Sequence, residues 1–179
     1  MRRMDSDPDT PAQDILGVMV RGYRIAISGH RGLPGRTADL IDKAVRAALA
    51  GHAQDVTGVS CLADGADQIF ARAVTDLGGK LEVIIPATGY RAGLPEEAHT
   101  EYDRLLTLAT AVRRLPFAEP APGSHMAAGK LMIDVADELY AVWDGLPARG
   151  YGGTADVVAY AREHCTPVCV IWPDGAQRD

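Results

Sequence analysis

Short runs of apolar and β-branched residues alternate along the chain with longer segments whose apolar residues recur at helical spacing. The short runs predict strands over 23–28, 55–62, 80–86, 111–116, 138–143 and 167–172. The longer segments predict helices over about 37–49, 96–109, 124–136 and 155–164. A further helix is predicted to begin in the ADGADQ stretch and to end near Gly78 and Gly79. Ser124 is expected to cap the helix that it begins. This alternation predicts an α/β, Rossmann-like three-layer αβα sandwich with a mostly parallel sheet of about six strands.

The strand-like runs around Ile25, Val83 and Val168 are almost continuously apolar, which is typical of strands that helices cover on both faces. A chain of 179 residues has the size of one domain. Its first residues are polar and rich in Asp and Pro, so we expect a flexible tail over 1–20 and a single domain over 21–179.

The formal net charge of -6 argues against a nucleic-acid-binding surface, which needs clustered Lys and Arg. We find no apolar run long enough to span a membrane and no apolar core behind the basic start of a secretory signal. The three cysteines, Cys61, Cys165 and Cys169, have neither disulfide-type nor metal-type spacing. We therefore expect a cytoplasmic protein without a metal site and without membrane contact.

Ligands of open α/β sheets bind outside the carboxyl ends of the strands, where helix N-termini favour phosphate. The loop after the first strand carries Gly29, His30 and Arg31, and an arginine suits phosphate or carboxylate. A plain turn with a solvated arginine is the alternative interpretation. The position at the end of the first strand favours a ligand role.

The loop after the second strand contains Ala63, Asp64, Gly65 and Asp67. Its acidic residues could accept hydrogen bonds from a ribose, or could simply stabilise the start of the following helix. Tyr90, Arg91 and His125 lie in other loops on the expected ligand side and are weaker candidates.

The loop before the last helix gives the strongest local signal: Arg149, Gly152, Gly153 and Thr154 follow a buried strand and open that helix. Glycines expose backbone N–H groups, and the Thr154 hydroxyl can donate to a phosphate or cap the helix. A structural turn is the alternative. The sequence lacks both the Walker-type loop and the G-x-G-x-x-G pattern after the first strand, which lowers the case for an ordinary dehydrogenase.

These loops carry a family resemblance. The stretch VSCLADGADQIFARAV resembles the Ser-Gly-Leu-Ala-x-Gly-x-Asp stretch of the DNA-processing protein DprA, and ISGHR resembles the Gly-Ser-Arg turn of the same fold. Residues 125–158 are similar to the Lonely Guy family, in which a Met-x-x-Arg-Lys helix precedes a P-G-G-x-G-T-x-x-E loop. Over about 23–172 the chain thus resembles the SLOG superfamily, Rossmann-like domains that bind nucleotides and nucleotide-derived ligands and commonly form dimers or larger assemblies.

The resemblance implies a phosphate cradle at Gly152, Gly153 and Thr154, but it does not carry over the charged pair of the Lonely Guy phosphoribohydrolases. Val157 stands at the position of their loop Glu, and Gly129 at that of their helix Arg, while Lys130 matches the Lys. The resemblance therefore favours a sensor or carrier of a nucleotide-type ligand, and it assigns no cofactor with certainty.

Two other functions stay open. A nucleoside-monophosphate phosphoribohydrolase or related nucleotide hydrolase would use Asp156, Asp144 or Lys130 as weak catalytic candidates. A Rossmann domain that only binds a protein partner is the third possibility. The sequence favours a small-molecule nucleotide-type ligand as partner, disfavours nucleic acid, and favours a homodimer or higher homo-oligomer.

Overall fold

The structure, a computed structural model, describes residues 22–52 and 55–178; the predicted tail over 1–20 lies outside the described residues. The strands in these ranges are β1 (Tyr23–Gly29), β2 (Val56–Ser60), β3 (Lys80–Ile85), β4 (Ala111–Arg114), β5 (Glu138–Val142) and β6 (Val168–Val170). The helices are α1 (Gly35–Leu49), α2 (Ala66–Asp76), the 3₁₀ turn η2 (Arg91–Gly93), α3 (Glu96–Leu108), α4 (Pro122–Val135) and α5 (Thr154–Glu163).

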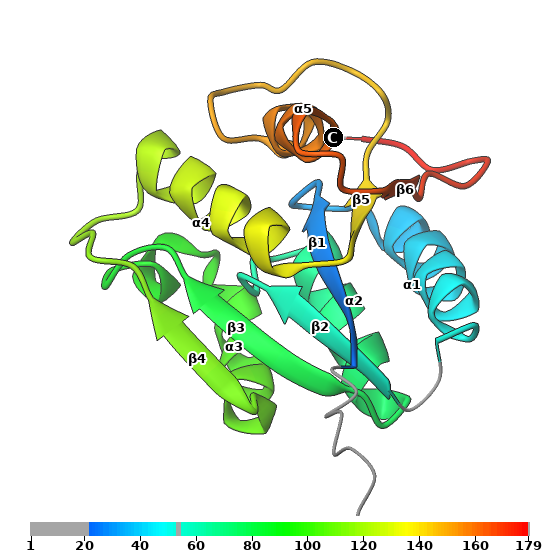
Figure 1. Ribbon diagram of the computed structural model, residues 1–179, viewed down its shortest axis with the longest axis horizontal. Coiled ribbons are helices and arrows are strands. Elements are labelled where there is room, and N and C mark those ends of the chain that lie inside the picture. The colour runs from blue at the N-terminus through cyan, green and yellow to red at the C-terminus, as the bar shows by residue number, and fades with distance from the viewer. Residues whose placement is uncertain (1–21, 53–54, 179) are drawn as a thin grey trace, which may run out of the picture.

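The strands form one sheet in the order β4-β3-β2-β1-β5-β6, and each neighbouring pair is parallel. Helices α4 and α5 pack together over one face, whereas α1, α2 and α3 cover the other (Figure 1). The predicted three-layer α/β sandwich is confirmed, and the sheet is parallel throughout the described residues rather than only mostly so.

Strand β1 shows why the chain folds in this way. Ile25, Ala26 and Ile27 have no solvent-exposed surface. Ile25 and Ile27 belong to a cluster with the apolar residues of α1 and α2, whereas Ala26 belongs to the cluster that contains those of α4 and α5. Because successive side chains of a strand point to opposite faces, a strand between two helix layers must be apolar at every position.

Several predicted element ends differ from the structure by one or more residues, and two of them have a clear physical cause. Ser124 is not the cap of α4: the helix begins at Pro122, whose fixed backbone suits a first turn, and the Ser124 hydroxyl accepts a hydrogen bond from the Ala121 N–H at 2.9 Å. Strand β2 ends at Ser60 rather than at residue 62. The N–H groups of Cys61 and Ala63 turn away from the sheet and donate to Asp67 instead.

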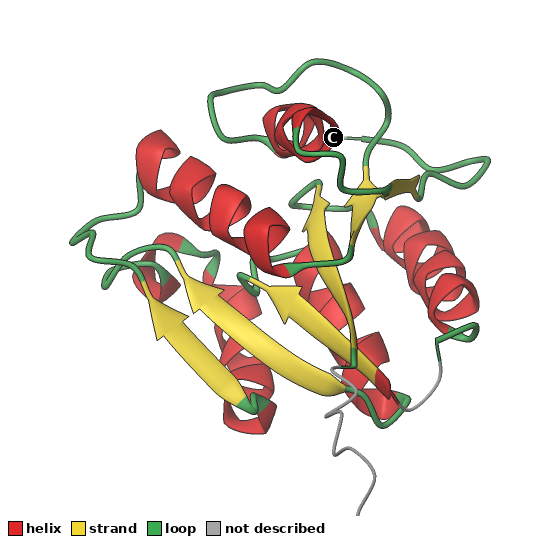
Figure 2. Cartoon of the chain, viewed as in Figure 1, coloured by secondary structure: helices red, strands yellow, loops and turns green. Residues whose placement is uncertain are grey.

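The parallel arrangement brings the carboxyl ends of the strands, and the loops that follow them, to one edge of the sheet (Figure 2). The chain moves from β1 outward to β2, β3 and β4, and then returns to the other side of β1 with β5. The strand order therefore reverses between β1 and β5, which is where open α/β sheets bind ligands. Within the described residues, no helix is long and apolar enough to cross a membrane.

Candidate functional site

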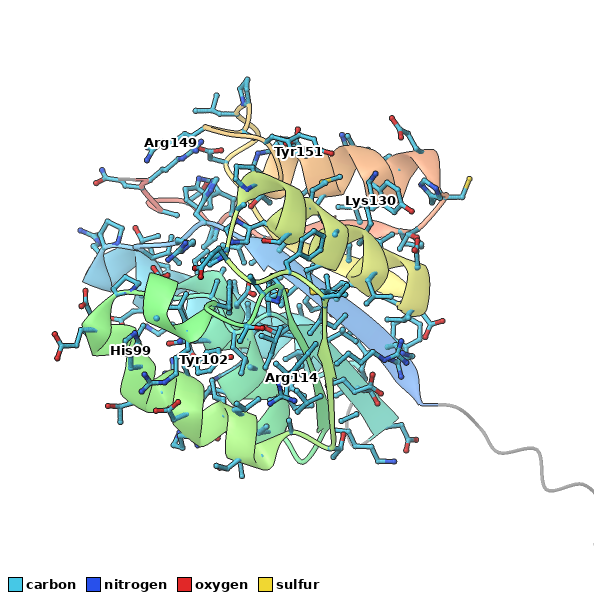
Figure 3. The ribbon with its side chains drawn as sticks, turned by 90° about the vertical axis from the view of Figure 1, so that its left-hand side faces the viewer. His99, Tyr102, Arg114, Lys130, Arg149 and Tyr151 are labelled. Carbon is cyan, nitrogen blue, oxygen red and sulfur yellow. The ribbon has the colours of Figure 1, made fainter. Side chains whose placement is uncertain are left out.

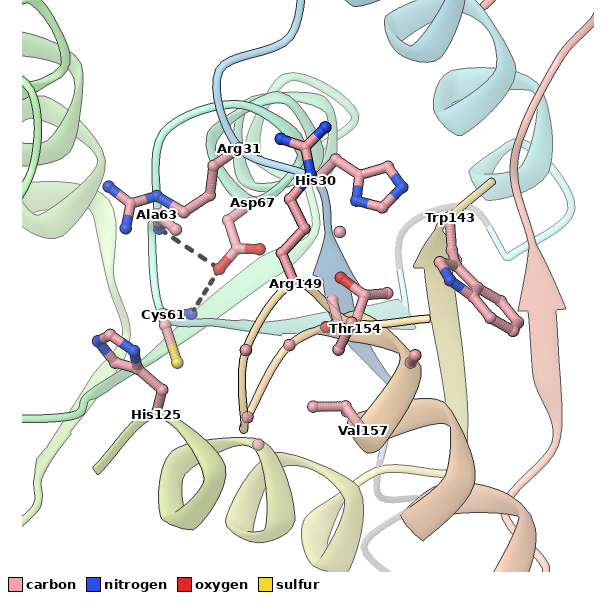
Figure 4. Close-up of a pocket in the computed structure, with 18 of the residues that line it drawn as sticks. His30, Arg31, Cys61, Ala63, Asp67, His125, Trp143, Arg149, Thr154 and Val157 are labelled. Carbon is pink, nitrogen blue, oxygen red and sulfur yellow. Dashed lines mark hydrogen bonds between the residues drawn. The ribbon is translucent and has the colours of Figure 1, made fainter. Parts of the chain in front are cut away.

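A cavity of about 360 Å³ lies at the reversal point between β1 and β5. The predicted ligand residues that line it are Gly29, His30, Arg31, Ala63, Asp67, Arg149, Gly152, Gly153 and Thr154. They come from the end of β1, from the loops that follow β1, β2 and β5 and from the starts of α2 and α5. Figure 4 shows six of them around one space: His30, Arg31, Ala63, Asp67, Arg149 and Thr154. Asp64 and Gly65 are not in the lining.

The end of β1 and the first residue of the following loop are tightly packed beside the cavity. A Cβ at Gly29 would lie 2.4 Å from the Ala66 Cβ, so this position has no room for a side chain. His30 is buried, and its Nε2 lies 3.1 Å from Asp144 Oδ1 and 3.3 Å from the Asp144 backbone nitrogen. Burial lowers the pKa of His30 below its ordinary value, and the charges of Arg178 and Arg149 act in the same direction, whereas Asp144 opposes them.

Asp144 links this loop to the C-terminal segment. Its Oδ2 lies 3.3 Å from Arg178 Nη1, and Arg178 also lines the cavity. Burial tends to raise the pKa of Asp144, but the Leu146 N–H, His30 and Arg178 outweigh it, so the pKa lies below its ordinary value. The sequence analysis missed Arg178 because it lies beyond the last strand and belongs to no motif.

The C-terminal segment is fastened to α1, which explains how a residue so late in the chain reaches the site. The Gln177 N–H donates to the Thr37 hydroxyl at 2.9 Å, and the same hydroxyl lies 3.2 Å from the Gln177 carbonyl oxygen. Thr37 is buried. This pair of contacts holds the segment across the edge of the sheet beside the cavity.

Asp64 acts on the cavity through Arg31. Asp64 Oδ1 accepts from Arg31 Nε at 2.6 Å, and Oδ2 accepts from the Gly32 N–H at 3.1 Å. The guanidinium of Arg31 is thereby held in place at the cavity wall. Gly65 is the N-cap of α2, so its place is structural.

Asp67 forms part of the buried floor of the cavity. Its Oδ2 accepts from the Cys61 N–H at 3.2 Å, from the Ala63 N–H at 3.4 Å and from the Ser60 hydroxyl at 3.4 Å. Burial raises the pKa of Asp67 to about 7, because these donors offset only part of the cost of removing the charge from water.

In the glycine-rich loop, the N–H groups of Gly152 and Gly153 form hydrogen bonds within the loop and with the start of α5. Gly152 has a φ of +84°, and its N–H donates to Asp156 Oδ2 at 2.8 Å. The Gly153 N–H donates to the Gly150 carbonyl at 3.2 Å. At the start of α5, the backbone N–H groups of Thr154 and Ala155 have no hydrogen-bond partner among the described residues.

Thr154 adds a hydroxyl to these two donors. Its side chain is 92% buried, as its exposed fraction is 8%, and it lines the cavity. Among the residues that the structure describes, its Oγ1 has no hydrogen-bond partner, and it does not cap α5. Figure 4 shows it facing the same space as Arg149. Three donors therefore meet at one helix N-terminus, where the helix dipole favours an anion.

The three catalytic candidates, Asp144, Asp156 and Lys130, are not in the cavity lining. Asp156 stabilises the glycine-rich loop, and Asp144 holds His30 and Arg178. The Lys130 ammonium lies 5.3 Å from the centre of the Tyr160 ring. Figure 3 shows Lys130 on α4 beside α5, apart from Arg149 and Tyr151 in the loop.

The weaker candidates divide in the same way. Tyr90 and His125 line the cavity, with ring centres 6.0 Å apart, whereas Arg91 forms an exposed ion pair with Asp103. Burial lowers the pKa of His125, and the charge of Arg31 acts in the same direction. Aromatic rings thus form one wall of a cavity whose rim carries arginines.

No protein-family model and no curated protein matches the sequence. Among solved structures, the fold is similar to DNA processing protein A from Helicobacter pylori, a single-stranded DNA binding protein (TM-score 0.65, 18% identity, 88% of this chain and 69% of that one). It is also similar to DNA processing protein A from Streptococcus pneumoniae (TM-score 0.63, 17% identity). In that comparison, 86% of this chain matches about half, 52%, of the other chain.

Two further similar structures are proteins named for binding or carrying a small molecule, the molybdenum cofactor. One is the molybdenum cofactor binding protein from Rippkaea orientalis (TM-score 0.57, 15% identity, 87% of this chain and 79% of that one). The other is the molybdenum cofactor carrier protein from Chlamydomonas reinhardtii (TM-score 0.55, 15% identity, 84% of this chain and 76% of that one). The resemblance to DprA is thereby confirmed at the level of the fold: this chain has the same Rossmann-like fold as these proteins.

Proposed function

We propose that this chain binds a nucleotide or nucleotide-derived, phosphate-bearing small molecule in the cavity between β1 and β5, as a sensor or carrier. The observation that carries the proposal is the start of α5. There the N–H groups of Thr154 and Ala155 and the buried Thr154 hydroxyl lack partners among the described residues and meet in the cavity lining. Donors left in this way at a helix N-terminus suit a phosphate.

The charge around the cavity supports an anionic ligand. Arg31, Arg149 and Arg178 all line it, although the chain carries a formal net charge of -6. Asp64 and Asp144 hold two of these arginines, so that their orientation is set before a ligand arrives. Preorganised charges lose less conformational entropy on binding than flexible ones.

The size of the cavity and the fold comparison support a small molecule over DNA. A volume of about 360 Å³ lies within the range of small-molecule sites, and aromatic residues line part of the wall. The acidic net charge disfavours a polyanion, whose binding depends on many phosphate contacts. Two proteins of similar fold are named for binding or carrying the molybdenum cofactor, which favours a carrier or sensor role.

Isothermal titration calorimetry against AMP, ADP-ribose, NAD, cyclic AMP and inorganic phosphate tests this proposal. Thr154→Val removes the hydroxyl and keeps the shape, so it should weaken binding roughly tenfold. Thr154→Ser is the matched control and should bind as the wild type does. Failure of every compound to bind would refute the proposal, as would equal affinities for the valine and serine variants.

The phosphoribohydrolase alternative has weaker support. Gly129 and Val157 line the cavity at the positions where the Lonely Guy resemblance would place charged residues, and Asp144, Asp156 and Lys130 are not in the lining.

We further propose that residues 21–179 form a single domain and that the chain works in a reducing cytoplasm, where its three cysteines remain thiols, as a homodimer or larger homo-oligomer. Light scattering coupled to size-exclusion chromatography would give the oligomeric state.

A further inference from the structure

The floor of the cavity holds two polar groups that the phosphate proposal does not use. The hydroxyl of Tyr90 and the Oδ1 atom of Asp67 have no hydrogen-bond partner among the described residues. Both side chains are more than nine-tenths buried, with exposed fractions of 4% for Tyr90 and 6% for Asp67. Unpaired polar groups in the protein interior are costly, so such a pair calls for a ligand or water.

Both groups reach the cavity. In the described part of the chain, every fully enclosed side-chain nitrogen or oxygen has a hydrogen-bond partner, so an unpaired atom must touch open space. Tyr90 and Asp67 both belong to the cavity lining. Figure 4 shows one carboxylate oxygen of Asp67 turned toward Cys61 and Ala63 and the other turned away from them.

The carboxylate is also fixed in orientation. Three donors, the Cys61 N–H, the Ala63 N–H and the Ser60 hydroxyl, hold Oδ2, so Oδ1 cannot rotate to satisfy itself elsewhere. A carboxylate oxygen accepts hydrogen bonds, and a phenol hydroxyl both donates and accepts. Together they match a ligand group that carries an O–H or N–H donor.

We propose that Asp67 and Tyr90 form a second subsite of this cavity, which binds an O–H or N–H donor of the phosphate-bearing ligand whose phosphate lies at the start of α5. This inference rests on the proposed function and adds to it a basis for selectivity among phosphate-bearing ligands. The cavity then distinguishes a phosphorylated sugar or nucleotide from phosphate itself. The donor can come from a ribose hydroxyl or from the N–H edge of a base, and the experiment separates these sources.

The test is calorimetry at pH 8 with inorganic phosphate, ribose 5-phosphate, 2-deoxyribose 5-phosphate, AMP and GMP. In Asp67→Asn the amide oxygen can replace Oδ2 and the amide N–H₂ then faces the cavity, so a donor meets the ligand's donor. We expect this variant to bind the sugar phosphate or nucleotide roughly ten- to a hundredfold more weakly, and phosphate about as the wild type does.

Two further variants keep the test decisive. Tyr90→Phe keeps the ring and removes only the hydroxyl, so it tests the subsite even where Asp67→Asn does not fold. Asp76→Asn removes one negative charge from the far end of the same helix, where Asp76 contacts Arg46, and should leave all affinities unchanged. A loss seen with ribose 5-phosphate but absent with the 2-deoxy compound identifies the ribose hydroxyl, whereas a difference between AMP and GMP identifies the base.

The pH dependence gives an independent readout. Only the ionised carboxylate accepts on both oxygens, so between pH 6 and pH 8 the ratio of the affinities for ribose 5-phosphate and inorganic phosphate should shift toward the sugar phosphate more in the wild type than in Asp67→Asn. The two phosphates also ionise in this range, and their ionisation changes the ratio equally in both proteins. The charged and titratable groups around this subsite are Asp64 and Cys61 from the loop after β2, Arg31 from the loop after β1, Tyr90 from the loop after β3, Tyr102 from α3 and His125 from α4. All of them are present in both proteins.

The inference is overturned if Asp67→Asn and Tyr90→Phe both bind these compounds as the wild type does, or if none of the compounds binds more tightly than inorganic phosphate. In that case, phosphate binding that Thr154→Val weakens would still support the proposed function. Absence of binding by phosphate and by every other compound would remove both proposals.

Discussion

Val157 occupies the space that a side chain at position 129 would need. A Cβ built on Gly129 would lie 2.8 Å from Val157 Cγ2, where α4 and α5 pack against each other. Both residues line the cavity. These are the two positions at which the Lonely Guy resemblance places an Arg and a Glu, so a close apolar contact stands where the hydrolases carry a charged pair.

This contact predicts an energetic coupling between the two positions. Alanine in place of a glycine inside a helix stabilises it by roughly 0.5–1 kcal/mol, but the methyl group of Gly129→Ala meets the stiff Val157 side chain. We expect Gly129→Ala to be more favourable in a Val157→Ala background than in the wild type, by about 1 kcal/mol. Urea denaturation of the four proteins of the cycle measures this difference, and equal effects in both backgrounds would contradict the packing described here.

The same contact predicts an absence of Lonely Guy-type catalysis. Cleavage of an N-glycosidic bond passes through a positively charged sugar, which a nearby carboxylate stabilises. Val157 supplies none, so no adenine should be released from AMP at concentrations that saturate binding, as measured by chromatography of the free base. Release that persists in Asp156→Asn would show that another group in the cavity is catalytic.

The strands, the helices and much of the lining could be predicted from the sequence because they follow from local patterns. Continuous apolar runs identify doubly covered strands, and a glycine-rich loop before a helix identifies its N-terminus. Arg178 could not be found in this way. It reaches the cavity only because Gln177 pairs with Thr37 on α1, a contact 140 residues apart in the sequence.

The residue types in the loops after β2 and β5 were informative, but their roles depend on three-dimensional contacts. Asp64 lies in the loop before α2 and Asp67 in the first turn of that helix, yet Asp64 holds Arg31 while Asp67 reaches the cavity floor. Asp156 likewise binds the Gly152 N–H instead of facing the cavity. Sequence patterns identify the edge of the sheet where such residues gather, whereas the direction of each side chain is set by packing.

The change in phosphate affinity on replacing Asp64 shows whether Asp64 acts by positioning Arg31 or only through its own negative charge. Removal of a negative charge near an anion site should strengthen phosphate binding if only electrostatics mattered. Because Asp64 fixes the Arg31 guanidinium, we expect Asp64→Ala to weaken the binding of inorganic phosphate roughly three- to tenfold in calorimetry. The stability should change by less than about 1 kcal/mol, as is usual for a pair with an exposed partner. Tighter phosphate binding by the variant would refute the positioning role.

Asp67 should make the stability of the ligand-free protein fall as the pH rises. Its pKa is raised from 3.8 in the unfolded chain to about 7 in the fold, so between these values the folded state binds more protons than the unfolded state. The loss of folding free energy caused by the buried Asp67 carboxyl therefore grows from about pH 4 to pH 7. Above pH 7 it stays constant at roughly 2–4 kcal/mol. Asp67→Asn, which stays neutral, should be more stable than the wild type by this amount at pH 8 and nearly equal to it at pH 4.

Two histidines act in the opposite direction over part of this range. The folded pKa values of His30 and His125 are lowered, chiefly by burial, so their contribution to stability is fully present above the unfolded value of 6.5 and is lost as the pH falls from there through the folded pKa values. Both are present in the wild type and in Asp67→Asn, so the difference between the two urea-denaturation profiles isolates the carboxyl. A difference that stays constant from pH 4 to pH 8 would mean that Asp67 is ionised throughout in the folded protein, and that the donors at Ser60, Cys61 and Ala63 compensate fully for its burial.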